Sequence, residues 1–212
     1  MKMYLSSYRI PVVDRLAQLV GKPVNEISIA LIPNAGDYYA PRAKAYKIND
    51  ILTYHRDKGL VHTDVVDLIN YRNPILLKQE LADYDVVWAS GGNTFCLRQE
   101  MKRSGLENFI TELLDDGLVY GGDSAGAVVV GTSLRGIESV DIPDFAEERV
   151  YDGLGLIKSV IIPHIGNEFF KEANQQTHDE HKGKDIIELS DAEALIVDGA
   201  NREIVATDTP EI

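Results

Sequence analysis

The sequence Tyr120-Gly121-Gly122-Asp123-Ser124-Ala125-Gly126-Ala127 begins within an apolar run, 118–122, and leads into a second apolar run, 128–130. It contains the pattern Gly-x-Ser-x-Gly, in which the serine sits on a sharp turn between a strand and a helix. Glycine two residues to either side of the serine avoids a steric clash in such a turn. The stretch therefore predicts a strand, a tight turn and a helix, with the Ser124 hydroxyl exposed at the edge of a sheet.

Similar apolar runs recur along the chain and alternate with segments of helical periodicity. The runs are 27–33, 61–68, 84–89, 118–122 and 159–163, and the expected helices are 42–58, 93–103 and 106–116. Runs rich in Val, Ile and Leu with little polar alternation are typical of parallel strands covered by helices on both faces. Near the end of the chain, the runs 194–197 and 203–206 flank Asp198-Gly199, a turn signal for an antiparallel hairpin. We predict an α/β fold with a doubly wound, mostly parallel sheet and a C-terminal β-hairpin.

The composition is that of a globular protein with an acidic surface. The 212 residues contain no repeat, linker or composition break, so we expect a single domain, 1–212. Asp and Glu number 34 against 21 Lys and Arg, and the net charge of −13 opposes binding to nucleic acid or to anionic membranes. The one cysteine, Cys96, cannot form an internal disulfide, and residues 1–9 lack the apolar run of a signal peptide. We expect a cytoplasmic protein.

The position of Ser124 on this turn favours a nucleophile. The alternative is a glycine-rich turn that packs closely or binds a phosphate through backbone N–H groups. However, the sequence has no G-x-G-x-x-G pattern, and neither Gly21-Lys22 nor Gly183-Lys184 is followed by the Ser or Thr of a P-loop. Nucleotide binding is therefore the weaker interpretation.

A serine nucleophile needs a base, and His164 is the candidate among the five histidines. It ends the apolar run 159–163, so it is expected to project from the carboxyl end of a strand, where ligand crevices form in open α/β sheets. A structural histidine is the alternative for His164 considered by itself. His178 and His181 are three residues apart and could share a helical face as metal ligands, but no further ligand is evident near them, and a solvated face is favoured. His55 and His62 have no motif context.

The third member of such a site is a carboxylate that orients the imidazole. In hydrolases with this serine turn the chain order is serine, acid, histidine, so the acid is expected between Ser124 and His164. Asp141 is preferred because it precedes Ile142-Pro143, where proline stiffens the chain, and Glu138 is its rival. The other carboxylates of this interval are Asp144, Glu147, Glu148 and Asp152.

Two backbone N–H groups are candidates for binding an oxyanion. One is the N–H of Ala125, directly after the nucleophile. The other is the N–H of Gly92, because the run 84–89 ends in two glycines and then enters a helix that Asn93 or Thr94 can cap. The alternative for Gly91-Gly92 is a simple turn between a strand and a helix.

Three motifs together, Ser90-Gly91-Gly92-Asn93-Thr94-Phe95, Gly122-Asp123-Ser124-Ala125-Gly126-Ala127 and Pro163-His164, resemble the peptidase E family of serine peptidases. That family includes aspartyl dipeptidases and cyanophycinases. The resemblance covers most of the chain and implies a class I glutamine-amidotransferase-like fold with a Ser-His-acid triad. By this likeness Ser124 is the nucleophile, His164 the base, Gly92 and Ala125 the oxyanion donors, and Asp141 the best match to the acid.

The resemblance does not carry over the aspartyl specificity. Dipeptidase members of the family bind an amino-terminal aspartate through a basic residue after the histidine, and no arginine occurs here between His164 and Asp185. Lysine at 171, 182 or 184 is the available substitute.

We therefore expect a serine hydrolase that cleaves a peptide or amide bond in a small peptide, without cofactor or metal, and with homodimer formation left open. The alternatives are a small esterase and a non-catalytic binding protein on the same scaffold. A glutamine amidotransferase would need cysteine in place of Ser124, and Cys96 lies on the other motif.

Overall fold

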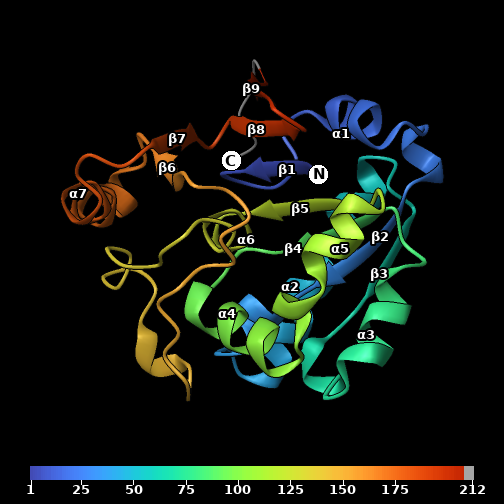
Figure 1. Ribbon diagram of the computed structural model, residues 1–212, viewed down its shortest axis with the longest axis horizontal. Coiled ribbons are helices and arrows are strands. Elements are labelled where there is room, and N and C mark those ends of the chain that lie inside the picture. Colours follow the sequence, from blue (N-terminus) through green and yellow to red (C-terminus); the bar gives the residue numbers. More distant parts are fainter. Residues whose placement is uncertain (208–212) are drawn as a thin grey trace.

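The computed structural model describes residues 1–207 and is built around a seven-stranded sheet (Figure 1). From one edge to the other its strands are β3 (His62–Val65), β2 (Ser28–Ile32), β4 (Val86–Ala89), β5 (Val119–Asp123), β1 (Lys2–Ser6), β8 (Glu193–Asp198) and β9 (Asn201–Ala206). The strands from β3 to β1 run parallel, whereas β8 is antiparallel to β1 and β9 is antiparallel to β8. This arrangement confirms the predicted mostly parallel sheet and its C-terminal hairpin.

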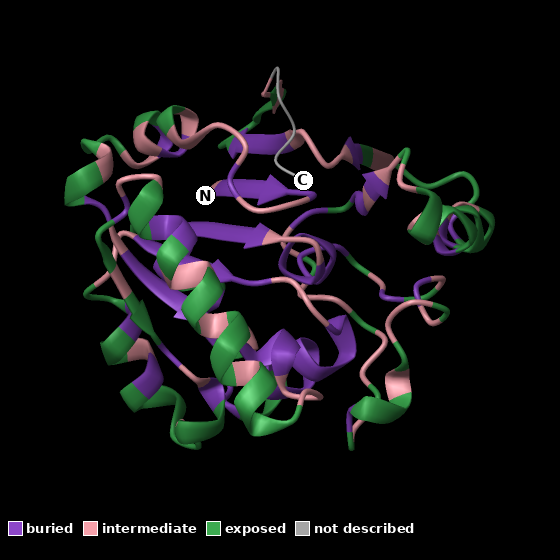
Figure 2. Cartoon of the chain, turned by 180° about the vertical axis from the view of Figure 1, so that it is seen from behind, coloured by how far each residue is buried: buried purple, intermediate pink, exposed green. Residues whose placement is uncertain are grey.

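Helices cover both faces of the sheet, as a doubly wound fold requires. One face packs against α1 (Val13–Val20) and α2 (Pro41–Asp57). The opposite face packs against α3 (Pro74–Leu81), α4 (Thr94–Arg103), α5 (Ile110–Asp115) and α6 (Ala125–Val128). Figure 2 shows that the inner strands of this sheet are buried, whereas the edge strands β3 and β9 and much of α2 and α3 are exposed.

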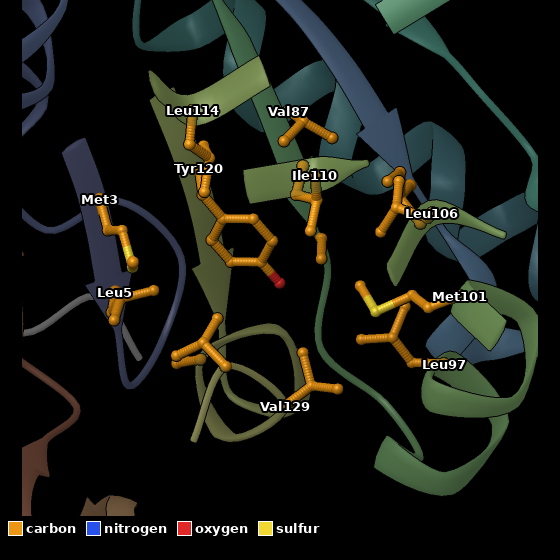
Figure 3. Packing of buried hydrophobic residues seen from close by; sticks show 14 of the residues in the cluster. Met3, Leu5, Val87, Leu97, Met101, Leu106, Ile110, Leu114, Tyr120 and Val129 are labelled. Carbon is orange, nitrogen blue, oxygen red and sulfur yellow. The ribbon is translucent and has the colours of Figure 1, made fainter. Parts of the chain in front are cut away.

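The alternation of side chains along each strand supplies both cores. In β4, Val86 and Trp88 join the cluster under α1 and α2, whereas Val87 and Ala89 join the cluster on the other face. Successive strand residues point to opposite faces, so a strand that is apolar throughout can be buried on both sides. Figure 3 shows Tyr120 of β5 packed among Leu5 of β1 and Ile110 of α5.

The predicted helices are present, with one break. The expected helix 42–58 is α2, and the expected helix 93–103 is α4, whose first turn is capped by the Asn93 side chain accepting from the Cys96 N–H at 3.0 Å. The segment 106–116 instead forms a single 3-10 turn followed by α5, because Phe109 lies outside the helical region at φ −131°.

The run 159–163 does not join the main sheet. It forms β6 (Val160–Ile165), which pairs with β7 (Ile186–Ser190) in a separate parallel ribbon, with α7 (Lys171–Glu180) packed against it. Figure 1 shows this ribbon beyond the carboxyl ends of β1 and β5. The carboxyl end of β6 therefore lies at the edge of the sheet where β5 ends. Among the described residues, no helix has the length and apolar character needed to cross a membrane.

Candidate active site

Ser124 occupies a strained turn between β5 and α6. Its backbone has φ 49° and ψ −110°, a conformation that a residue with a side chain adopts at a cost on the order of 1–3 kcal/mol. The turn is fixed on both sides: the Ser124 N–H donates to the Ser6 carbonyl at 3.0 Å, and the Tyr120 hydroxyl donates to the Gly126 carbonyl at 2.8 Å. Strain held in this way is characteristic of a functional residue.

The flanking glycines are required by close backbone contacts. A Cβ on Gly122 would lie 2.6 Å from the Gly126 carbonyl carbon, and a Cβ on Gly126 would lie 2.0 Å from the Ala89 carbonyl oxygen. Both distances are far below a van der Waals contact. The physical reason inferred from the Gly-x-Ser-x-Gly pattern therefore holds in the structure.

His164 meets Ser124 although the two residues come from different sheets. The Nε2 atom of His164 lies 2.9 Å from Ser124 Oγ. His164 has φ 61° at the end of β6, its N–H donates to Ser7 Oγ at 2.7 Å, and its ring stacks on Phe170 at 4.1 Å between centroids. These contacts hold the imidazole in place, and only 6% of the residue is exposed.

The carboxylate that contacts the His164 ring is Asp191, in the turn between β7 and β8. Its Oδ1 lies 2.5 Å from His164 Nδ1 and also accepts from Ser7 Oγ at 2.9 Å. Burial by itself would raise the pKa of the Asp191 carboxyl, but the hydrogen bonds with His164, Ser7 and Asn167 hold this pKa below its usual value. Because an ionised carboxylate can only accept, Nδ1 carries the proton and Nε2 is free to accept from the Ser124 hydroxyl.

Asp141, the acid preferred from the sequence, lies near Ser124 and His164 but is not the partner of the imidazole, and the structure corrects that expectation. Its Oδ2 accepts from the Thr94 N–H at 2.9 Å and from the Thr94 hydroxyl, so it caps the start of α4. No hydrogen bond links it to His164 within residues 1–207, and burial raises the pKa of its carboxyl. The rival, Glu138, accepts from the Gly136 N–H at 2.6 Å in its own turn.

Sequence reasoning missed Asp191 because it searched only between the serine and the histidine. The signal was present: Asp191 follows the run Ile186–Ser190, so it stands at the carboxyl end of a parallel strand, as His164 does. Parallel strands end at the same edge of a sheet, so residues that follow two such strands can meet there whatever their order in the chain.

The two predicted oxyanion donors lie beside Ser124. A Cβ added to Gly91 would lie 3.1 Å from Ser124 Cβ, so the Gly91-Gly92 turn packs directly against the serine. Gly92 has φ 147°, and a Cβ there would lie 2.4 Å from the Ala35 carbonyl oxygen, which only glycine tolerates. Within residues 1–207, neither the Gly92 N–H nor the Ala125 N–H donates to another group. Both N–H groups are therefore available to a ligand.

Asp123 joins these two turns and was not identified from the sequence. It is half-buried, and its carboxylate accepts from the Trp88 indole N–H at 2.9 Å and from the Gly91 N–H at 3.1 Å. Burial raises the pKa of this carboxyl, although both hydrogen bonds act in the opposite direction. Asp123 thus fixes the Gly91-Gly92 turn relative to Ser124.

A cavity of about 440 Å³ opens beside Ser124 and His164. Its aromatic lining comes from Tyr8, Tyr39, Tyr54, Trp88 and Phe170. The basic residues that line it are Arg9 and Lys47, whereas the lysines at 171, 182 and 184 do not border it. The three lysines named above as available substitutes for the family's basic residue therefore lie outside the lining of this cavity.

The remaining candidates have other contacts. His178 Nε2 lies 2.8 Å from Glu188, and His181 Nε2 lies 2.9 Å from the Arg135 carbonyl oxygen. Within residues 1–207, no group of three His, Cys, Asp or Glu side chains is arranged to hold a metal ion. Cys96 is buried in α4, and this burial raises the pKa of its thiol to about 12, so it is a poor nucleophile.

Known proteins resemble this chain over its whole length or over parts of it. An uncharacterized peptidase of Listeria monocytogenes is 37% identical over 122 residues, which are 57% of this chain and 60% of that protein. An uncharacterized peptidase of Pasteurella multocida is 29% identical over 84% of each chain. A crystal structure of a candidate peptidase E protein from Listeria monocytogenes EGD-e, 25% identical, superposes with a TM-score of 0.83 over 98% of each chain.

These similarities extend over most of the chain and are not limited to the turn around Ser124. The match to the first Listeria relative spans less than two thirds of that protein's length, whereas the structural match spans nearly all of both chains. The fold agrees with the class I glutamine-amidotransferase-like fold expected from the motifs. The model of peptidase family S51 matches residues 4–205, and the chain belongs to this family.

Proposed function

We propose that this protein is a serine peptidase that hydrolyses a peptide bond in small peptides through an acyl-enzyme. The observation that carries the proposal is the chain of contacts from Ser124 Oγ to His164 Nε2, at 2.9 Å, and from His164 Nδ1 to Asp191 Oδ1, at 2.5 Å. A nucleophile, a base and an orienting carboxylate in this order form a catalytic triad, whatever their order in the chain. Membership of a peptidase family supports the same activity.

In the proposed reaction, Ser124 Oγ attacks the peptide carbonyl carbon while His164 Nε2 takes the hydroxyl proton. Asp191 stabilises the imidazolium that forms, and the N–H groups of Gly92 and Ala125 bind the oxyanion. His164 then gives its proton to the departing amine as the carbon–nitrogen bond breaks. Water, deprotonated by His164, attacks the acyl-enzyme and returns the hydroxyl to Ser124.

The cavity supports a small substrate. A volume of about 440 Å³ lies within the range of pockets that enclose a small molecule, and it is bounded by the described chain on several sides. Relatives of this chain that carry the name peptidase E, such as one from Haemophilus influenzae that is 28% identical over 71% of this chain, favour a peptide as the substrate.

The first test is turnover of a dipeptide panel by the parent protein and by Ser124→Ala. We expect the variant to lose up to about a million-fold in kcat, because nucleophile and base act as a unit. Ser139→Ala, at an exposed serine, is the matched control and retains the parent rate. Equal turnover by Ser124→Ala and the parent would exclude the proposed mechanism.

A further inference from the structure

The cavity beside Ser124 has a buried inner end formed by helix α2. At the outer end of the cavity the helix contributes Lys47 and Asp50, which are exposed. Ile51 follows, and Tyr54 and His55, which are buried, line the inner end. His55 is only 1% exposed, and its ring meets the Trp88 ring edge-on at 6.0 Å between centroids. Because Trp88 also donates to Asp123, next to Ser124, a continuous wall leads from the nucleophile to His55.

His55 presents an open hydrogen-bonding atom at this inner end. Its Nδ1 lies 3.2 Å from Thr63 Oγ1, and the Thr63 hydroxyl donates to the Leu60 carbonyl oxygen at 3.4 Å. Since the Thr63 hydroxyl proton points to Leu60, the proton between His55 and Thr63 belongs to His55 Nδ1. The neutral ring then has a lone pair on Nε2. Within residues 1–207, the hydrogen bond of the His55 ring is made by Nδ1, and none is made by Nε2.

The imidazole stays uncharged at neutral pH. Burial, together with the nearby charge of Arg9, lowers the pKa of His55 to about 4. A neutral imidazole with Nδ1 protonated offers an acceptor, not a cation, to whatever enters the cavity.

The other polar groups at the inner end already have partners. The Tyr54 hydroxyl donates to the Ile10 carbonyl oxygen at 3.0 Å and accepts from the Ile10 N–H at 3.2 Å. The Arg9 guanidinium is paired with Asp50 at 2.9 Å, donates to the Tyr8 hydroxyl at 3.1 Å and lies 4.6 Å from the Tyr54 ring centroid. The charge of Arg9 is thus compensated by Asp50.

We propose that this cavity selects an aromatic substrate side chain ending in a hydrogen-bond donor, tyrosine above all, whose hydroxyl donates to His55 Nε2. The partly exposed rings of Tyr8 and Tyr39 line the same cavity, and aromatic side chains bury a large apolar area against such rings. A buried acceptor discriminates against an analogue that lacks the donor, because that analogue leaves the acceptor desolvated and unpaired. This inference rests on the proposed peptidase function and specifies its substrate.

The test compares kcat/KM of the parent protein for the dipeptides Tyr-Ala, Phe-Ala and Asp-Ala, and for Ala-Tyr, Ala-Phe and Ala-Asp. At one of the two positions, tyrosine is expected to exceed phenylalanine by roughly 10- to 100-fold, the effect of one buried hydrogen bond, and to exceed aspartate as well. A preference for aspartate at both positions, or equal rates for tyrosine and phenylalanine at both, would overturn the proposal. These measurements need no variant, so they do not depend on how a substitution folds.

The His55→Phe variant then locates the discrimination. It keeps a ring against Trp88 but removes the acceptor, so the tyrosine-to-phenylalanine ratio is expected to fall to about one while the phenylalanine dipeptide is still cleaved. His55→Gln, whose amide can place an oxygen near the former Nε2, is expected to restore part of the ratio. His62→Phe, at an exposed histidine of β3, is the matched control and keeps the parent ratio. A ratio unchanged in His55→Phe would contradict the role of His55.

The test of the tyrosine preference can fail without the test of the peptidase function failing. Ser124→Ala tests whether the chain hydrolyses peptides at all, whichever side chain is preferred. If Ser124→Ala loses turnover while aspartate is the best substrate residue, the peptidase function stands and the inference about His55 fails.

Discussion

The carboxylates Asp141 and Asp191 lie in opposite environments. In the sequence, Asp141 precedes and Asp191 follows β6, the strand that carries His164. Asp191 is half-buried, contacts His164 at 2.5 Å and has a lowered carboxyl pKa, whereas Asp141 caps α4 through Thr94 and has a raised one. The pKa of Asp141 is raised because burial outweighs the hydrogen bonds from Thr94 and the charge interaction with His164. The comparison teaches that a place at the carboxyl end of the strands, and not chain order, decides which acid reaches the histidine.

The largest expected effect separates the two acids by catalysis. Asp191→Asn keeps the size of the side chain but can donate to His164, which favours the wrong tautomer of the imidazole. We expect kcat to fall by about 10⁴-fold, as in other triads that lose their carboxylate. The measurement is steady-state turnover of the best dipeptide. Asp141→Asn, compared in the same assay, is expected to lose less than about tenfold, and the reverse order would refute the assignment of Asp191.

A second, smaller effect separates the two acids by pH. A carboxyl whose pKa is raised on folding destabilises the folded state when ionised, and this penalty is relieved as the pH falls through the raised value. Asp141 belongs to this class, so the parent is expected to gain unfolding free energy relative to Asp141→Asn as the pH falls from 7 to the ordinary aspartate value.

Asp191 belongs to the opposite class. Its lowered pKa contributes stability that is present above the ordinary aspartate value and is lost only as the pH falls through the lowered value. The stability difference between the parent and Asp191→Asn is therefore expected to shrink only as the pH falls below the ordinary aspartate value. Urea unfolding over this pH range measures both differences, and a difference between the parent and Asp141→Asn that stays constant down to the ordinary aspartate value would contradict the raised pKa of Asp141.

The smallest effect concerns Glu138, the rival acid from the sequence. Within the described part of the chain its carboxylate accepts only from the Gly136 N–H, and a glutamine side-chain oxygen can accept from the same donor. We expect Glu138→Gln to change kcat by less than about twofold and unfolding free energy by less than about 0.5 kcal/mol. A large loss of turnover with unchanged stability would return Glu138 to the catalytic site.

The fold and half of the candidate site were predictable from local sequence signals. The turn around Ser124 was predictable because only glycine fits at its two flanking positions, where a Cβ would lie 2.0 or 2.6 Å from backbone atoms. The end of the run 159–163 identified His164, although that run belongs to the small β6–β7 ribbon and not to the main sheet. Neither inference needed knowledge of distant contacts.

The rest depends on contacts between segments far apart in the chain. Asp191 reaches His164 because β7 pairs in parallel with β6, a pairing that no local pattern specifies. Asp123 and His55 look unremarkable in the sequence, since their environments are created by Trp88, which packs between them from β4. Long-range packing of this kind can be stated only once the strand order is known.

The most direct test of the account is the rate at which a fluorophosphonate probe labels the folded protein, with the adduct located by mass spectrometry. The account predicts a single adduct on Ser124 in the parent, strongly slowed labelling in Asp191→Asn, and labelling close to the parent rate in Asp141→Asn. An adduct on another serine, or labelling of Ser124 that depends on Asp141 and not on Asp191, would contradict it.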